Sequence, residues 1–294
     1  MKKIELKKTS EFIEIKCDGK IITNYYFSSK YPKPFLYPVL DPNGNCITRH
    51  YPMKKVEGET TDHIHHRSIW TAFGDVNGVD IWGEKEHYGR IITKKFLKLS
   101  GGEFAHIIVL NHWVSEYNNK VMDEEREIKI YNLDNDEKIF DFNIKFKSNI
   151  DNVKFGDTKE GGIISVRVAT SMDGDKGGKI ENSEGKIGEK DCWGKKAKWC
   201  DYSGNVCNKI VGIAIFDHPE NLKPAYWHVR NYGLFAVNPF GLSYFENNPN
   251  KRGDFILEKG KEGIFKYRII IHRGDAKESN LEKRYAAYLN SKVE

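Results

Sequence analysis

The segment DHIHHRSIWTAFGDVNGVDIWGE (residues 62–84) gathers side chains suited to acid–base chemistry or to metal binding. On a strand, where side chains alternate between the two faces, His63 and His65 would share one face and His66 would point the other way. Two imidazoles on one face can bind one metal ion or one substrate. The sequence leaves open whether the pair binds a metal, acts on a substrate, or makes structural hydrogen bonds.

A divalent metal would need a third ligand beside His63 and His65. Glu84, His87 and His228 are the candidates, because imidazole together with carboxylate suits zinc, manganese or iron. The expected ligand set is His63, His65 and Glu84.

Arg67 is a candidate substrate-binding residue. Its guanidinium offers a planar fork of donors that suits a carboxylate or vicinal hydroxyls. The alternative is a salt bridge to Asp62 or Glu59.

Two tryptophans and an asparagine in the same segment could hold a sugar. Trp70 and Trp82 could stack on one side of a sugar ring while polar groups bind its hydroxyls, or both could belong to the core. Asn77 is the candidate amide, and its alternative is a turn held by side-chain hydrogen bonds. The run around it lacks the glutamate that ends a calcium-binding EF-hand loop, so we exclude that motif.

A second cluster lies far downstream, in HPENLKPAYWHVRNYGLFAVNPFG (residues 218–241). On a strand, Tyr226, His228 and Arg230 would share one face. Such a polar face is costly to bury without a purpose. If the two clusters meet in space, we expect a single site with Tyr226 and Arg230 among its substrate-binding residues.

Strands must position both clusters, because alternating or β-branched runs such as FIEIKC, FAHIIVLNHWV, KIFDFNIKF and IFKYRIIIHR recur along the chain. DPNGN (41–45) and NLDNDEK (132–138) read as hairpin connections. Residues 275–291 show helical spacing of Leu281, Tyr285 and Leu289. The Gly-, Lys- and Ser-rich residues 174–208 are expected to form a long loop over a binding face. We predict one all-β domain over residues 1–294, an antiparallel β-sandwich with a short C-terminal helix, and a closed barrel is the rival.

Composition narrows the class of protein. The 294 residues are 39% hydrophobic, and 47 basic residues nearly balance 42 acidic ones without any block of like charge, which gives no support to nucleic-acid binding. Five cysteines without a CxxC motif are typical of a reducing cytoplasm. No signal peptide or apolar run of about 20 residues is apparent, so we expect a cytoplasmic protein without a membrane partner.

Long motifs connect the chain to a known family. YPVLDPNGNCITRHYPM, GETTDHIHHRSIWTAFGDVNGVDIWGE, GDTKEGGIISVRVA, WGKKAKWCDYSG and PAYWHVRNYGLFAVNPFG resemble the bacterial PmoA-like family of unknown function, labelled "methane oxygenase PmoA", over about residues 34–275. The label refers to a membrane subunit with several spans, so the resemblance does not imply methane oxidation for a chain without such a span. It implies a galactose-mutarotase-like supersandwich and, by association with sugar-utilisation genes, a small-molecule carbohydrate as partner.

The resemblance also implies which residues form the site. His63, His65, His66 and Arg67 match a DHxHHR-type motif; Glu160 matches an EGG-type motif; and His228 and Arg230 match a YWHxRxYG-type motif. Ser68 stands where many relatives have glycine.

Three functions are compatible with these residues. The leading hypothesis is a lyase, hydrolase or epimerase acting on a sugar or keto-glycoside. In one version His65 or Glu160 removes a proton next to a ketone, a divalent metal or Arg230 stabilises the enolate, and His228 protonates the leaving group. The alternatives are a non-catalytic carbohydrate-binding protein and a metal-dependent oxygenase with His63, His65 and Glu84 as its facial triad.

Overall fold

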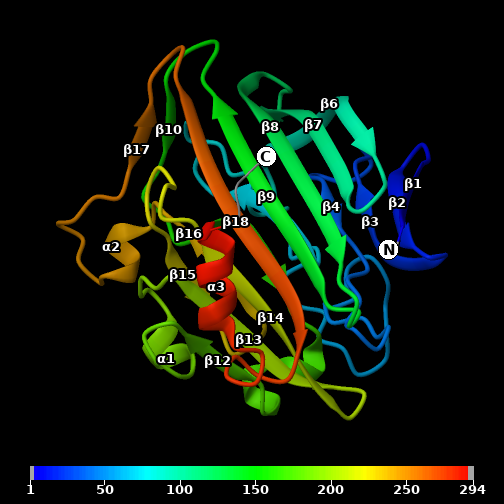
Figure 1. Ribbon diagram of the computed structural model, residues 1–294. Helices are drawn as coiled ribbons and strands as arrows, with labels where there is room; N and C mark the ends of the chain where they lie inside the picture. The colour runs from blue at the N-terminus through cyan, green and yellow to red at the C-terminus, as the bar shows by residue number, and fades with distance from the viewer. Residues whose placement is uncertain (1–2, 291–294) are drawn as a thin grey trace.

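Two eight-stranded antiparallel sheets face each other across most of the molecule (Figure 1). The computed structural model describes residues 3–290, so residues 1–2 and 291–294 at the ends of the predicted domain lie outside the described part. The first sheet has the order β1 (Ile4–Lys8), β2 (Phe12–Cys17), β3 (Lys20–Tyr26), β4 (Phe35–Leu36), β5 (Ile69–Phe73), β11 (Gly161–Arg167), β16 (Leu234–Asn238) and β15 (Tyr226–Val229). The second has the order β12 (Lys179–Asn182), β13 (Trp199–Val206), β14 (Lys209–Asp217), β18 (Glu262–Arg273), β9 (Lys138–Lys147), β8 (Lys120–Asn132), β7 (Ala105–Val114) and β6 (Arg90–Ser100).

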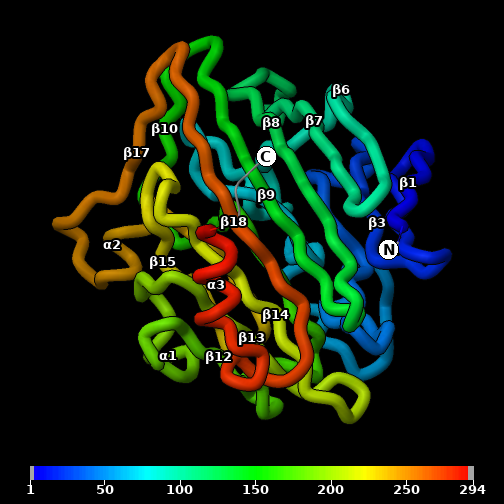
Figure 2. The backbone as a smooth tube through the Cα atoms, viewed as in Figure 1, coloured from blue at the N-terminus to red at the C-terminus, as the bar shows by residue number. Residues whose placement is uncertain are grey.

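Smaller elements surround the sheets. They are the pair β10 (Val153–Phe155) and β17 (Phe255–Leu257), the 3-10 turns η1 (Thr170–Met172) and η2 (Gly174–Lys176), and the helices α1 (Glu189–Cys192), α2 (Leu242–Phe245) and α3 (Leu281–Asn290). In Figure 2 the N-terminal strands, in blue, lie beside β6 and β7, and α2 lies at the opposite side. A bridge between Ile4 and Gly102 joins the edges of the two sheets at the N-terminal side.

The core between the sheets follows from the alternation of the strands. In β9, KIFDFNIKFK, buried residues alternate with partly exposed ones, so one face packs inward. Strands of both sheets contribute to a single apolar cluster, which includes Phe140 and Phe142 of β9 and Phe235 and Val237 of β16. The predicted antiparallel β-sandwich is therefore confirmed.

The predicted C-terminal helix is also confirmed. α3 crosses the outer face of the second sheet (Figure 1), where Leu281, Tyr285 and Tyr288 pack against Phe216 and Ile270. Leu289, which the spacing placed on the buried face, is 40% exposed, and Tyr288 takes its place. Ser291, the last residue of the predicted helix, lies outside the described residues.

The expected long loop over residues 174–208 is wrong in part. β12 and β13 lie within this segment and pair with each other and with β14. Three polar residues of this segment, Asn182, Asp201 and Ser203, are buried in the sheet, where Asp201 of β13 contacts His272 of β18 (2.9 Å). Across residues 3–290, no helix is long and apolar enough to span a membrane.

The outer face of the first sheet carries a separate apolar cluster. Trp70 and Ala72 of β5 and Leu234 and Ala236 of β16 point to this side, because their neighbours in the strands point into the core. Trp82 completes the cluster. The histidine segment lies on this face.

Candidate functional site

Residues from three distant segments line one cavity of about 560 Å³. They are the histidines of the HIHH motif, Glu160 before β11, and His228, Arg230 and Tyr232 of the β15–β16 hairpin. The volume lies in the range of small-molecule sites. The structure thus brings the two clusters together, as we expected for a single site.

The HIHH motif is a turn and not a strand, which corrects the expected alternation. His63 has a left-handed backbone (φ 43°) and its carbonyl accepts the amide N–H of His66 (3.0 Å), so the chain reverses within four residues. The rings form one stack: His63 lies between Tyr232 (4.9 Å) and His66 (4.7 Å), and His66 stacks on Trp70 (5.1 Å). His65 lies edge-on to both rings, at 5.7 Å from His63 and 4.4 Å from His66, so all three histidines contact one another.

Two buried arginines stabilise the HIHH turn through hydrogen bonds and ion pairs. Arg49 and Arg167 are fully buried and both form ion pairs with Asp62. Arg49 also donates to the carbonyl of His63 (3.0 Å), and Arg167 donates to Nδ1 of His66 (3.1 Å). Because arginine only donates, the neutral ring of His66 carries its proton on Nε2.

Ser68 ends the turn at a strained position. Its φ of 58° is in the left-handed region, where a residue with a side chain costs about 1–2 kcal/mol more than glycine. The hydroxyl of Thr48 contacts that of Ser68 (2.8 Å). This contact holds the side chain of Ser68 at the end of the turn.

Glu84 belongs to a buried ion cluster and not to a metal site. Both of its oxygens accept hydrogen bonds from Arg67, and the ammonium of buried Lys33 lies 3.2 Å away. Burial would raise the pKa of Glu84, but these two cations hold it below its usual range. With its carboxylate occupied, Glu84 does not fit the predicted ligand set with His63 and His65. In the described part of the chain, no group of three or more His, Cys, Asp and Glu residues is arranged to hold a metal ion.

The same cluster corrects the role expected for Arg67. The guanidinium is buried against Glu84, a partner that neither sequence alternative named. The rings of Tyr31 and Phe35 lie within 6 Å of it, at 5.7 and 5.9 Å. Arg67 supports the wall of the cavity and does not line it.

Burial keeps two of the predicted catalytic histidines neutral. Burial lowers the pKa of His65 to about 3, with a further contribution from Lys33. Burial likewise lowers the pKa of His228 to about 3, and Arg230 adds to the shift. Nδ1 of His228 has no hydrogen-bond partner among residues 3–290. This shift favours the neutral ring of His228 at neutral pH, and its expected role as the acid stays a prediction.

The β15–β16 hairpin presents Arg230 to the cavity. Its amide N–H donates to the carbonyl of Leu234 (2.9 Å), which closes the turn between the strands. Nε of Arg230 approaches the carboxylate of Glu189 in α1 to 3.2 Å, and the other oxygen of Glu189 accepts the amide N–H of Asn231 (2.6 Å). Residues 174–208, which were expected to form a loop, thus orient Arg230 through Glu189 of α1.

Glu160 is a half-exposed carboxylate in the cavity wall, with the ammonium of Lys159 at 3.5 Å. Its backbone is fixed by a hydrogen bond from the amide of Gly74 to its carbonyl (2.8 Å). A side chain at Gly74 would come within 2.5 Å of that carbonyl, so this close approach requires glycine. A register shift follows in β11 between Gly162 and Ser165.

Three predicted substrate-binding residues lie away from the cavity or under its wall. Trp70 is buried beneath His66 and does not reach a ligand. Asn77 is engaged in a turn, where its side chain bonds to the backbone of Asn152 (3.1 Å) and Lys154 (2.6 Å). Tyr226 lines another hollow and donates to Glu246 (2.7 Å). Trp82 does line the cavity, edge-on to His65.

Sequence reasoning missed Tyr232, Asp80 and two lysines, Lys85 and Lys159, which also line the cavity. Tyr232 stacks on His63, and burial raises its pKa to about 12. Its place in YWHVRNYG beside two chosen residues was the available signal. Lys85 and Lys159 gave no such sequence signal, because isolated lysines are ordinary surface residues.

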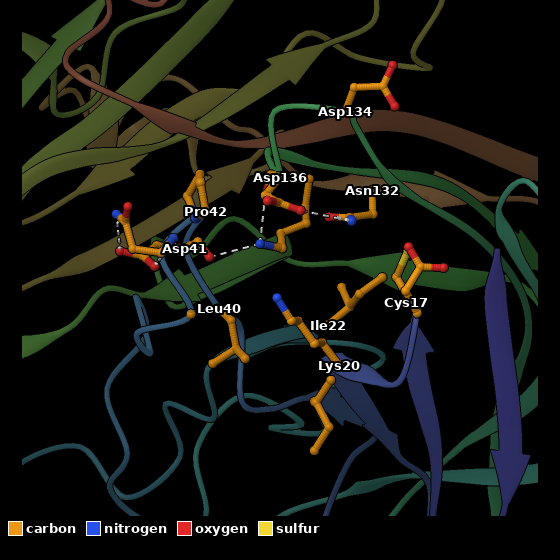
Figure 3. Close-up of a pocket in the computed structure, with 14 residues that line it drawn as sticks. Cys17, Lys20, Ile22, Leu40, Asp41, Pro42, Asn132, Asp134 and Asp136 are labelled. Carbon is orange, nitrogen blue, oxygen red and sulfur yellow. Dashed lines mark hydrogen bonds between the residues drawn. The ribbon is translucent and has the colours of Figure 1, made fainter. Parts of the chain in front are cut away.

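A second cavity of about 640 Å³ contains none of the predicted site residues (Figure 3). The ammonium of Lys138 donates there to the carbonyl oxygens of Asp41 and Asp136 (both 2.8 Å). The carboxylate of Asp41 is occupied by the backbone of its own turn, at Asn43 and Asn45. This confirms the predicted turn at 41–45.

Acid should destabilise the protein through His228. Its unfolded pKa is near 6.5 and its folded value about 3, so below pH 6.5 the unfolded chain binds more protons and stability falls with pH. At pH 5 this amounts to about 2 kcal/mol, from about 1.4 kcal/mol per pKa unit. Between pH 7 and pH 5, the free energy of unfolding of the native chain should fall by about 2 kcal/mol more than that of the His228→Gln variant, as measured by urea unfolding. Parallel pH profiles for the two chains would contradict the assignment.

Comparisons with known proteins give a family match and loose matches to solved structures. The model of a family described as "Family of unknown function (DUF6807)" matches residues 13–286. An α-galactosidase from Lactobacillus brevis has 6% identity and a TM-score of 0.42, over 92% of this chain and 40% of that one. A putative kojibiose phosphorylase from the human microbiome has 10% identity and a TM-score of 0.35, over 92% and 32%. This chain spans less than half the length of either, and no curated protein matches it.

Proposed function

The chain belongs to the DUF6807 family of unknown function, and we propose that it is an enzyme that acts on a sugar, with Glu160 as its acid–base group. The convergence of the HIHH turn, Glu160 and the β15–β16 hairpin on one cavity is the observation that carries this proposal. The family description contains no PmoA designation, so that part of the resemblance stays a prediction.

Each group in the cavity suits a different part of a sugar. Trp82 and Tyr232 offer apolar surface, and neutral His65 and His228 can bind hydroxyls without changing their protonation state. Arg230 and Lys159 are cations that can stabilise an oxyanion. Of the two carboxylates in the wall, Asp80 accepts the amide N–H groups of Trp82 and Gly83 (2.8 and 2.9 Å), so Glu160 is the one available as base.

The reaction that fits best is β-elimination from a 3-keto-glycoside. Glu160 takes the proton from carbon 2, which the neighbouring ketone acidifies, and charge develops on the carbonyl oxygen near Arg230 and Lys159. The electron pair then forms the double bond between carbons 1 and 2 while the bond from carbon 1 to the glycosidic oxygen breaks. The proton on Glu160 passes to that oxygen, so one residue serves as base and then as acid. This replaces the protonation by His228 that the sequence suggested.

Deuterium exchange tests the first step. With methyl 3-keto-glucopyranoside in D₂O, the native chain should remove the carbon-2 proton signal and release methanol, followed by NMR. Glu160→Gln should slow both by about 10²- to 10⁴-fold, the usual contribution of general acid–base catalysis. Glu125→Gln, which alters an exposed ion pair with Lys145 on the other sheet, is the matched control and should leave the rate unchanged.

The same experiment separates the alternatives. Binding of the glycoside without exchange or methanol release would favour the non-catalytic carbohydrate-binding protein. Exchange that survives Glu160→Gln would remove Glu160 from its role as base.

A further inference from the structure

Positive charge exceeds negative charge in the wall of the cavity. Lys85, Lys159 and Arg230 line it, against the two carboxylates of Asp80 and Glu160. The carboxylate of Asp80 accepts hydrogen bonds from two backbone amide N–H groups, which stabilise its negative charge. A ligand therefore meets more cations than free carboxylates.

The buried layer behind the wall repeats this imbalance at Glu84. Lys33 and Arg67 share the single carboxylate of Glu84. Beneath the HIHH turn, Arg49 and Arg167 share the single carboxylate of Asp62. The set at Glu84 leaves one unit of positive charge uncompensated, whereas Glu59 and Asp173 also act on the two arginines of the second set. Fields from buried charges are screened by salt much less than fields from exposed ones.

The groups that line the cavity respond to this field. Besides burial, Lys33 and Lys85 lower the pKa of His65, and Arg230 and Lys159 lower that of His228. Behind the wall, burial and the neighbouring Arg167 lower the pKa of Arg49 to about 10. Cations, including fixed arginines and lysines, disfavour further positive charge throughout the site.

We infer that the sugar bound here is anionic and carries a carboxylate or phosphate group that Arg230 and Lys159 bind; this rests on the proposed function. Arg230 offers a guanidinium fork that matches either oxyanion, and Glu189 orients it from α1 through Nε. Lys159 lies 3.5 Å from Glu160, and a ligand anion would draw its ammonium away from that carboxylate. Glu160 would thereby be released to act as the base.

Calorimetric binding to the full chain tests this inference, with glucose, glucuronate and glucose 6-phosphate at low salt. We expect at least one anionic sugar to bind at least tenfold more tightly than glucose, and the advantage to shrink at about 0.5 M salt as exposed charges are screened. Comparing glucuronate with glucose 6-phosphate distinguishes the two sources of the anion. Inorganic phosphate that bound as tightly as the sugar phosphate would reveal an adventitious ion only and overturn the inference.

Substitutions of Arg230 and Lys159 test whether these two residues bind the anionic group. Arg230→Gln and Lys159→Gln should each reduce the affinity for the anionic sugar by about tenfold and thereby remove its preference over glucose. Lys145→Gln, on the outer face of the second sheet, should change neither. Circular dichroism and the unfolding temperature check the fold of each variant.

The outcomes separate this inference from the proposed function. Equal or tighter binding of neutral glucose would overturn the anionic preference, whereas the exchange of the 3-keto-glycoside would still support an enzyme. Absence of binding by all three sugars together with absence of exchange would overturn both.

Discussion

Glu84→Gln is expected to lower the free energy of unfolding by about 3–5 kcal/mol, because it leaves two buried cations without their shared counter-charge. Lys33 is 1% exposed and its ammonium contacts the Glu84 carboxylate at 3.2 Å, while Arg67 binds the same group through two hydrogen bonds. Glutamine nearly preserves the shape, so the loss reports the charge.

Lys33 makes this loss depend on pH. Burial lowers its pKa to about 8 even with Glu84 present, and removal of the carboxylate lowers it further. Above pH 8 the folded native chain and the folded variant both hold Lys33 in its neutral form, so the lost carboxylate matters little for this residue. Below pH 8 the native chain holds a charged Lys33 beside Glu84. The variant must either bury that ammonium without a carboxylate or deprotonate it, and both lower its stability. The deficit of the variant should therefore shrink from pH 6 to pH 9.

Urea unfolding of the native chain and Glu84→Gln at several pH values measures this effect. Glu125→Gln is the control, because that glutamate forms an ion pair with Lys145 at the surface and should change stability by less than about 1 kcal/mol. A Glu84→Gln loss as small as that of the control would show that the buried cluster is not held together by charge.

Asp62→Asn is expected to cost about 3 kcal/mol and to loosen the HIHH turn. Its carboxylate is the shared partner of the fully buried Arg49 and Arg167. Ion pairs with Arg167 and Arg49 outweigh burial and hold the pKa of Asp62 below its usual range, so the native pairing is lost as pH falls through that value.

Hydrogen exchange measures the local part of this effect, because the amide N–H of His66 bonds to His63 within the turn. That amide should exchange faster in Asp62→Asn, together with a lower unfolding temperature. Glu262→Gln, which weakens an exposed pair with Lys147 (3.1 Å), serves as control. Unchanged exchange at His66 in a destabilised variant would show that the arginines hold the turn without help from Asp62.

Much of the fold could be predicted from the sequence because its signal is local. The alternation in KIFDFNIKF requires one buried face, and DPNGN supplies an aspartate that caps its own turn. The segment 174–208 was misread because Asp201 and Ser203 of β13 are polar yet buried, and their neighbours in the sheet come from distant strands. Local composition cannot reveal such partners.

The sequence by itself determined the fold class of this protein, an antiparallel β-sandwich. It also determined which side chains a site could use, in two clusters of histidine, arginine and aromatic residues. Only the tertiary structure decided how they are used. It turned HIHH into an aromatic stack over Arg49 and Arg167, and it committed Arg67 and Glu84 to each other in the wall. It also placed Glu160 and His228 on one cavity. The physical reason is that burial and charge partners set whether a side chain is free to react, and they depend on residues about a hundred or more positions away along the chain, as His66 with Arg167 and His63 with Tyr232 show.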